Sequence, residues 1–303
     1  MSVFTSPPEE SAPAQPAPPA PPARRRLGPS PARKAVSYGV LTVVAILFVA
    51  PILFMIVGSL KPDERVLTEG GSWKALVPTD ASFQNYSDVF DRVNFGRFMF
   101  NSLVITACVV VGGLFVNSLA AYAFARMKWR GRNLIFTAIL ALVIVPFEAI
   151  AVPLFSQMVA WGWRNSYQVQ IIPFIASAFS IFLFYTFFLQ LPRQLEEAAR
   201  IDGAGPWRTF FHIIVPSTKP AFATVAILTF LATWGSFLWP VMVTSEETYR
   251  PLPVAIATFQ TLPPLQWGDI MAFGVMMVAP ILIVFLLFQR WFVASVASSG
   301  LKG

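Results

Sequence analysis

Six apolar stretches alternate with polar segments along the chain. They cover roughly residues 38–60, 100–124, 134–160, 166–191, 220–243 and 270–292. A helix needs about 20 predominantly apolar residues to cross the hydrocarbon core of a bilayer, and each stretch is long enough. The pattern therefore predicts an all-α, polytopic membrane protein with six transmembrane helices.

Composition strengthens this prediction. Hydrophobic residues make up 56% of the 303 residues, charged residues make up 12%, and the mean hydropathy is +0.64. Soluble domains carry about 25% charged residues. An ordinary water-soluble domain is therefore excluded.

The basic residues indicate which way the spans face. The segment 125–133 contains four basic residues and no acid, and the segments before the first span and at 192–219 are also basic. Lys and Arg accumulate in short cytoplasmic loops. We expect both termini and residues 192–219 in the cytoplasm. The net charge of +7 is then a topology signal and not a sign of nucleic-acid binding.

Residues 1–35 differ in composition from the rest. The first 32 residues contain ten prolines and hardly any large apolar side chain. Such a segment cannot bury a core, so we expect a disordered, Pro/Ala-rich cytoplasmic N-terminus before a transmembrane domain at 36–303. The alternative is a docking peptide for a proline-binding partner.

The polar segment 192–220 has the pattern of two short helices joined by a turn. A glycine suits the left-handed residue that ends a helix, so the first helix should stop near Asp202, before Gly203. Pro206 can begin the second helix, and Pro216 should end it because proline lacks a backbone donor. A hairpin of this kind is either a docking surface or an amphipathic connector that lies on the membrane.

The spacing within this hairpin carries a resemblance. Glu197-Ala198-Ala199 is followed after three residues by Gly203, after nine more by Ile213, and then by Val215-Pro216. This pattern resembles the cytoplasmic EAA loop of permease subunits in bacterial binding-protein-dependent ABC importers, and is most similar to their carbohydrate branch. Val215 stands where the family usually has leucine.

The resemblance implies a fold and a set of partners. The fold would be that of a type I ABC importer permease for a sugar or sugar derivative, with the hairpin at 192–220 coupling it to an ATPase. The implied partners are a second permease subunit in a heterodimer, two copies of a cytoplasmic ABC ATPase and an extracytoplasmic substrate-binding protein. No cofactor is expected in this chain, since ATP and Mg would be held by the partner ATPase. The implied coupling residues are Glu197, Ala198, Ala199, Asp202, Gly203, Ala204, Gly205, Ile213 and Pro216.

Catalytic chemistry has little support in the sequence. His212 is the sole histidine and Cys108 the sole cysteine, so neither a histidine cluster nor a cysteine-based metal site is available. No G-x-x-x-x-G-K-[ST] phosphate loop is present. A secondary transporter or an intramembrane enzyme with six spans remains the alternative, although charges within the spans are scarce.

Polar residues in the spans are candidates for a substrate pathway. Glu148 lies between Pro146 and Pro153 in the third span, where proline frees backbone carbonyl groups. It either lines the pathway or sits near the end of the span. Asn117 and Trp234 are further candidates, and weaker ones are Asn101, Ser118, Gln168, Gln170, Tyr122, Phe174 and Trp239. The alternatives for these are helix–helix hydrogen bonding and core packing.

Two segments outside the spans complete the expectations. The segment 244–269 should form a semi-rigid, partly exposed finger that touches the binding protein, as in the relatives. The last residues, 298–303, should reach the ATPase as a thin strand after a span that ends near Phe292.

Overall fold

The computed structural model describes the backbone of residues 31–300 and the side chains of residues 34–288. Residues 1–30 and 301–303 lie outside the described part, and with them most of the N-terminal segment 1–35. The chain divides into two compact units, residues 1–50 and 51–303. The described part of the first unit is the beginning of α1 (Pro31–Ser59), whose side chains are exposed from Lys34 to Val49.

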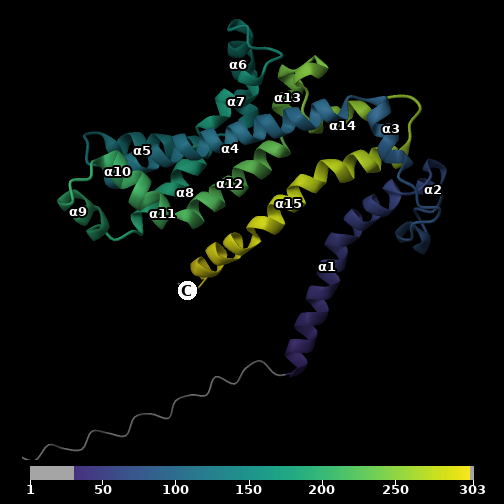
Figure 1. The fold of residues 1–303 in the computed structure, drawn as a ribbon, viewed down its shortest axis with the longest axis horizontal. Coiled ribbons are helices and arrows are strands. Elements are labelled where there is room, and N and C mark those ends of the chain that lie inside the picture. Colours follow the sequence, from purple (N-terminus) through teal and green to yellow (C-terminus); the bar gives the residue numbers. More distant parts are fainter. Residues whose placement is uncertain (1–30, 301–303) are drawn as a thin grey trace, which may run out of the picture. The chain divides into compact units, whose positions relative to one another are not determined.

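The described residues of the second unit form helices joined by turns and loops, with no β-strand among them (Figure 1). After α1, its first elements are α2 (Asp63–Thr68), η1 (Trp73–Leu76), α3 (Gln84–Arg92), α4 (Phe95–Arg126), α5 (Arg132–Leu142), α6 (Phe147–Ala160), α7 (Tyr167–Ile175) and α8 (Ala178–Leu189). The hairpin and the remainder comprise α9 (Gln194–Ile201), α10 (Pro206–Thr209), the π-helical turn η2 (Phe210–Ile214), α11 (Val215–Ser217), α12 (Lys219–Trp234), α13 (Leu238–Val243), η3 (Glu247–Tyr249), α14 (Leu252–Phe259) and α15 (Trp267–Gly300).

Within the described residues, four helical stretches are individually long and apolar enough to cross a membrane. They are Lys34–Ser59, Phe95–Arg126, Tyr167–Leu189 and Trp267–Phe288. Two bent pairs meet the same test jointly: α5 with α6, bent by 99°, and Pro206–Ser217 with α12, bent by 80°. Six spans result when each bent pair is one span, as the sequence predicted.

The long helix α4 organises the second unit. It contacts α7, α8, α12 and α14. Near the end of α4 that contains Ala121 and Ala125, a core of aromatic and aliphatic side chains joins α8, η2 and α12. Near its other end, Phe95 and Phe98 pack with residues of α14 and α15. The hairpin α9–α11 and helices α3 and α14 therefore lie at opposite ends of α4 (Figure 1).

The third apolar stretch was predicted as one helix at 134–160, which is wrong in detail. The helix breaks between Leu142 and Phe147. Pro146 disfavours helical backbone at Val145 and lacks the N–H that would continue the helix. The chain therefore turns sharply before α6 begins.

The fifth stretch, predicted at 220–243, is also interrupted. Helix α12 ends at Trp234 with Gly235 as its C-cap, and α13 starts only at Leu238. Pro240 could not donate a hydrogen bond in a continuous helix, and glycine weakens helical backbone. These two residues explain why the apolar run does not form one helix.

The predicted finger at 244–269 is a packed structure over most of its length. Leu252, Val254, Ala255 and Phe259 of α14 are buried, since their spacing puts them on one helical face. Exposed side chains remain at 245–248 and, apart from the half-buried Leu262 and Gln266, at 260–267. The expected exposed surface is thus confined to these two short segments.

Arg92 fixes the second of these segments. Its guanidinium donates to Leu262 O at 3.2 Å and to Pro264 O at 2.7 Å, and it pairs with Asp269 Oδ2 at 2.7 Å. It also lies over the ring of Phe259, 4.9 Å from the centroid. The backbone around residues 262–264 is therefore held to α3 and α15.

Lys61 plays a similar part directly after α1. Its ammonium group is buried and donates to Glu69 Oε2 at 2.8 Å and to Lys74 O at 2.6 Å. The hydrogen bond from Lys61, together with one from Thr79, lowers the pKa of the Glu69 carboxyl below its ordinary value, against the opposing effect of burial. The connection between α1 and α3 is thus folded around a buried cation.

Candidate functional site

The hairpin at 192–220 matches the predicted local structure closely. Helix α9 ends at Ile201, Asp202 is its C-cap, and Gly203 has a φ of +76°. Gly205 caps α10, which begins at Pro206. The second helix ends at Ser217, one residue beyond Pro216, because the chain passes through the π-helical turn η2 before the proline.

One face of the hairpin is packed onto the helices. Glu196, Ala199, Phe210 and Ile214 are buried, and the ring of Phe210 lies 5.2 Å from that of Tyr122 on α4. Glu196 stands in the first turn of α9, where a carboxylate is favoured by the helix dipole. The hairpin is therefore anchored on its inner face.

Arg126 provides the strongest of these anchors. At the last residue of α4, its Nε donates to Glu196 Oε1 at 2.5 Å, and both side chains are at least nine-tenths buried. Its Nη1 donates to Phe188 O and Leu191 O at 3.3 and 3.1 Å, at the carbonyl end of α8. One guanidinium thus joins α4, α8 and α9.

The other face of the hairpin exposes apolar side chains. Ile201 is 87% exposed, Trp207 63% and Phe211 45%, and the rings of Trp207 and Phe211 are stacked. Glu197 and Ala198 are exposed beside them, whereas Ala199 is buried. We call Ile201, Trp207 and Phe211 the hairpin patch.

The remaining predicted coupling residues occupy this same hairpin. Asp202, Gly203, Gly205 and Pro216 are exposed, and Ala204 and Ile213 are half-buried. The structure therefore brings all of the residues implied by the EAA pattern together on one compact element.

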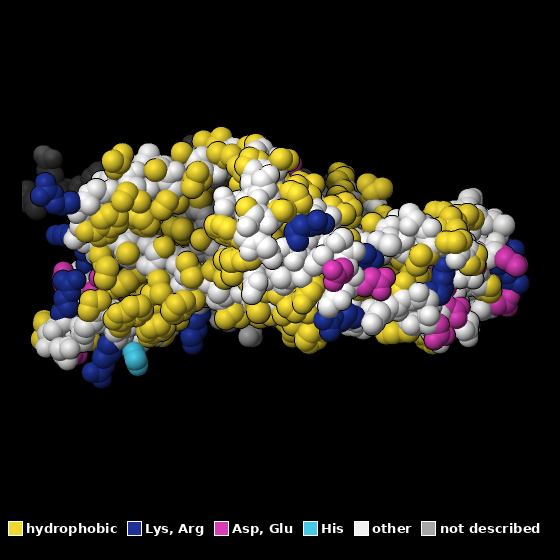
Figure 2. All heavy atoms as spheres, turned by 90° about the horizontal axis from the view of Figure 1, so that it is seen from above, with side chains coloured by type: hydrophobic (Ala, Val, Ile, Leu, Met, Phe, Trp, Pro, Cys, Tyr) yellow, Lys and Arg dark blue, Asp and Glu magenta, His cyan; other side chains and the backbone are white. Residues whose placement is uncertain are grey.

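The surface charge differs between the ends of the second unit. Figure 2 shows Lys and Arg gathered at the end marked by the single histidine, His212 of the hairpin. Hydrophobic side chains cover much of the middle, and Asp and Glu on this face lie mainly towards the opposite end (Figure 2).

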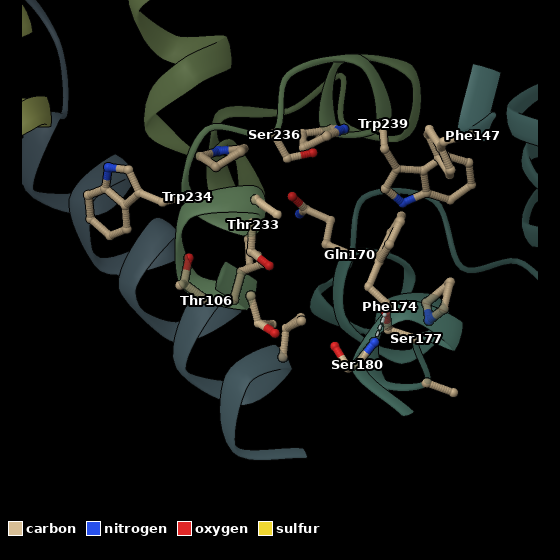
Figure 3. A pocket seen from close by; sticks show the side chains of 18 of the residues that line it. Thr106, Phe147, Gln170, Phe174, Ser177, Ser180, Thr233, Trp234, Ser236 and Trp239 are labelled. Carbon is tan, nitrogen blue, oxygen red and sulfur yellow. Dashed lines mark hydrogen bonds between the residues drawn. The ribbon is translucent and has the colours of Figure 1, made fainter. Parts of the chain in front are cut away.

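A cavity of about 660 Å³ lies between α4, α6, α7, α12 and α13. Aromatic side chains form much of its wall, and hydroxyl and amide groups are interspersed among them (Figure 3). The aromatic members are Phe147, Phe174, Phe179, Trp234 and Trp239, and the polar members are Ser102, Thr106, Gln170, Ser177, Ser180, Thr229, Thr233 and Ser236. Its size lies within the range of small-molecule sites, about 300–1,000 Å³.

The three pathway candidates occupy different environments. Trp234 lines the cavity, and its Nε1 donates to Met277 O at 3.1 Å. Glu148 is exposed in the first turn of α6 and is not among the lining residues. Asn117 is buried outside the cavity wall, where its amide donates to Ile175 O and accepts from Ser177 N, so it bridges the break between α7 and α8.

The weaker candidates also separate into two groups. Phe174, Trp239 and Gln170 line the cavity, whereas Asn101, Ser118, Tyr122 and Gln168 do not. Asn101 binds the backbone carbonyls of Thr248 and Arg250 at 3.0 and 2.9 Å. The hydroxyls of Thr106 and Ser180 were missed, since a single polar residue in an apolar run carries no signal of which side it faces.

A metal centre is not evident in the described residues, which contain no group of three or more His, Cys, Asp or Glu side chains placed to hold an ion. The predicted contact of residues 298–303 lies where side chains are not described. Helix α15 continues to Gly300, so residues 298–300 are helical and do not form the thin strand that we expected.

Comparison with known proteins identifies the family. Residues 113–298 match the model of the binding-protein-dependent transport system inner membrane component. The chain belongs to this family. It is therefore a permease subunit of a membrane transport system, and membership implies that it works with a substrate-binding protein and an ATPase.

Individual relatives cover most of the permease. It is 34% identical to the arabinooligosaccharides transport system permease protein of Bacillus subtilis, over 86% of this chain and 92% of the relative. It is 32% identical to the diacetylchitobiose uptake system permease protein of Streptomyces coelicolor, over 87% of each chain. These names support a transport subunit rather than an enzyme.

A solved structure confirms the fold. A chain in the crystal structure of a bacterial ABC transporter involved in the import of the acidic polysaccharide alginate matches with a TM-score of 0.77. The match covers 86% of the permease and 96% of that chain at 24% sequence identity. The type I importer architecture implied by the sequence is thus found in the structure.

Gly203 offers a test of the hairpin geometry. A Cβ at this position would meet nothing within 4 Å, so the cost of a side chain comes from the positive φ alone. We expect Gly203→Val to lose transport and ATPase co-purification, because a β-branched residue is strained there by about 1–3 kcal/mol. Gly203→Asn is the matched control and should retain both, since asparagine tolerates this backbone region. Equal behaviour of the two variants would contradict the geometric explanation.

Arg126 offers a test of the anchor. Arg126→Met should lower the free energy of unfolding of the detergent-purified protein by about 3–5 kcal/mol, because Glu196 is left buried and unpaired. The double variant Arg126→Met, Glu196→Leu should recover most of this loss. Arg130→Met, which changes an exposed cation in the same segment, should have little effect. Additive losses in the double variant would show that the pair is not coupled.

Proposed function

We propose that this permease imports a sugar or sugar derivative across the bacterial plasma membrane and is driven by a separate ATPase that docks on the hairpin. The relatives above are named for arabinooligosaccharides and diacetylchitobiose, and another, from Thermococcus litoralis, for trehalose and maltose at 34% identity over 86% of this chain. The cavity, with aromatic faces and neutral polar groups, has the chemistry to line the path of such a cargo.

The observation that carries the coupling proposal is the hairpin patch. Exposed apolar side chains at a basic, polar turn mark a surface for another protein. The inner face of the hairpin is fixed by Arg126 and by the core around Phe210. A displacement of the hairpin by a docked protein would therefore be transmitted to α4 and α8, because these contacts hold the hairpin to both helices.

The proposed assembly contains four further subunits or partners. A second permease completes a heterodimer, two copies of the ATPase hold ATP and Mg, and an extracytoplasmic binding protein delivers the sugar. The gathering of Lys and Arg at the hairpin end supports a cytoplasmic position for the hairpin. Both termini are proposed on the same side from the basic segments of the sequence. Membrane lipid surrounds the spans.

The competing function is a secondary transporter or an intramembrane enzyme with six spans. A secondary transporter is expected to carry broken helices in two repeated halves with ion-binding groups between them. The cavity here is lined without ionisable side chains among the described residues, and the EAA hairpin has no role in such a mechanism. The importer therefore accounts for more of the structure.

The hairpin patch is tested by Ile201→Asp. Burial of an isoleucine side chain contributes about 2 kcal/mol, so its replacement by a charge should weaken ATPase binding roughly 30-fold or more. Co-purification of the ATPase with the permease measures this, and membrane insertion should be unchanged. If the hairpin is an amphipathic connector on the membrane, the ATPase will co-purify at the wild-type level and the proposal fails.

The opposite end is tested by Leu265→Asp. Leu265 is 51% exposed and directly follows Pro264, whose carbonyl is held by Arg92. We expect this variant to lose stimulation of ATP hydrolysis by the binding protein while the ATPase still co-purifies. Each of the two variants thus serves as the control for the other. Full stimulation in Leu265→Asp would remove residues 260–265 from the proposed contact.

A further inference from the structure

The wall of the cavity is polar but carries no charge. Among the described residues that line it there is no Asp, Glu, Lys, Arg or His. A carboxylate or phosphate placed in such a cavity would lose its hydration without gaining a cation. The cavity therefore suits an uncharged cargo.

Gln170 lies in the wall of this cavity and carries a buried acceptor whose orientation is fixed. The side chain is 3% exposed, and its Nε2 donates to Tyr249 O at 2.9 Å. A flipped amide would set two oxygen atoms against each other there, so the hydrogen bond assigns the orientation of the amide. Its Oε1 is buried and has no hydrogen-bond partner among the described residues.

The position of this amide is central. In Figure 3 it extends between Thr233, Trp234 and Ser236 on one side and Phe174 and Trp239 on the other. An unpartnered buried acceptor costs about 1–3 kcal/mol, and a donor from a bound molecule would remove that cost. A hydroxyl group supplies such a donor without bringing a charge.

The aromatic wall supplies the complementary apolar surface. The rings of Phe147, Phe174 and Trp239 lie with centroids 5.6–5.9 Å apart, so they hold one another in place. Trp239 is only 2% exposed and its Nε1 is already used by Val169 O at 2.8 Å, so it supports the half-buried rings of Phe147 and Phe174, which supply the contact surface. The C–H face of a sugar ring packs on such surfaces while its hydroxyls seek polar partners.

We propose that this cavity binds one ring of an uncharged oligosaccharide, with Gln170 Oε1 accepting a hydrogen bond from a sugar hydroxyl. This inference rests on the proposed function, since it takes the cavity to lie on the import path. It adds that the cargo is neutral and that Gln170 contacts it directly.

The cargo class is tested with the complete transporter in proteoliposomes, including the binding protein. Labelled arabinotriose, diacetylchitobiose and maltose are compared with sn-glycerol-3-phosphate and an alginate trisaccharide. We expect uptake of at least one neutral sugar and of neither anion. Uptake of anions alone overturns this inference but leaves the proposed function intact. Uptake of none, with ATP hydrolysis still stimulated by the binding protein, rejects the sugar importer and this inference with it.

The contact is tested by the amount of sugar moved per ATP hydrolysed. Gln170→Met should lower this ratio about tenfold, the factor expected for one lost buried hydrogen bond. Asn101→Leu is the matched control, because Asn101 holds carbonyls on either side of Tyr249 but does not line the cavity. It should reduce uptake and ATP hydrolysis in parallel and keep the ratio within about twofold. The same change of ratio in both variants would mean that Gln170 only anchors the loop, and the contact would be rejected.

Discussion

The buried guanidinium of Arg126 is the interaction on which the rest of the arrangement depends. A cation removed from water at the end of a membrane helix needs acceptors close by. Glu196 of α9 and the carbonyls of Phe188 and Leu191 at the end of α8 supply three, while Nη2 of Arg126 is buried without a hydrogen-bond partner among the described residues. The need to satisfy one charge therefore fixes the ends of α4 and α8 and the start of α9 relative to one another.

Two further side chains of α4 also bind backbone groups of neighbouring segments. Asn117 of α4 holds both sides of the break between α7 and α8, and Asn101 holds the backbone at Thr248 and Arg250. Between these levels, Ser102 and Thr106 face the cavity. Helix α4 thus connects the hairpin, the broken helix beside the cavity and the loop at the opposite end through hydrogen bonds to backbone atoms. Directional hydrogen bonds couple a movement of α4 to its neighbours more tightly than apolar contacts alone, because apolar surfaces can slide past one another.

The features that the sequence predicted well are those decided locally. Gly203, Gly205 and Pro206 determine backbone conformation by themselves, so the hairpin boundaries followed from residue type. The breaks near Pro146 and at Gly235 were missed because hydropathy counts an apolar run without regard to its backbone. The partnership of Arg126 with Glu196 joins residues 70 positions apart. The direction in which Gln170 points depends on Tyr249, which is 79 positions away. Neither pairing produces a periodic pattern in the sequence, so neither could be predicted from it.

The separation of charge from cavity has a mechanistic consequence. The charged side chains of α4 itself, Arg97 and Arg126, stand near its two ends, whereas the cavity beside the middle of the helix is lined by neutral groups. We propose that the energy for movement enters at the hairpin, on the cytoplasmic side of the helices. The hairpin, anchored through a buried ion pair and exposing an apolar patch, is the element built to receive it. If the cavity lines the import path, as we propose, drive and cargo are handled by different chemistry at different levels of one helix, and the cavity can change its cargo without altering the coupling surface.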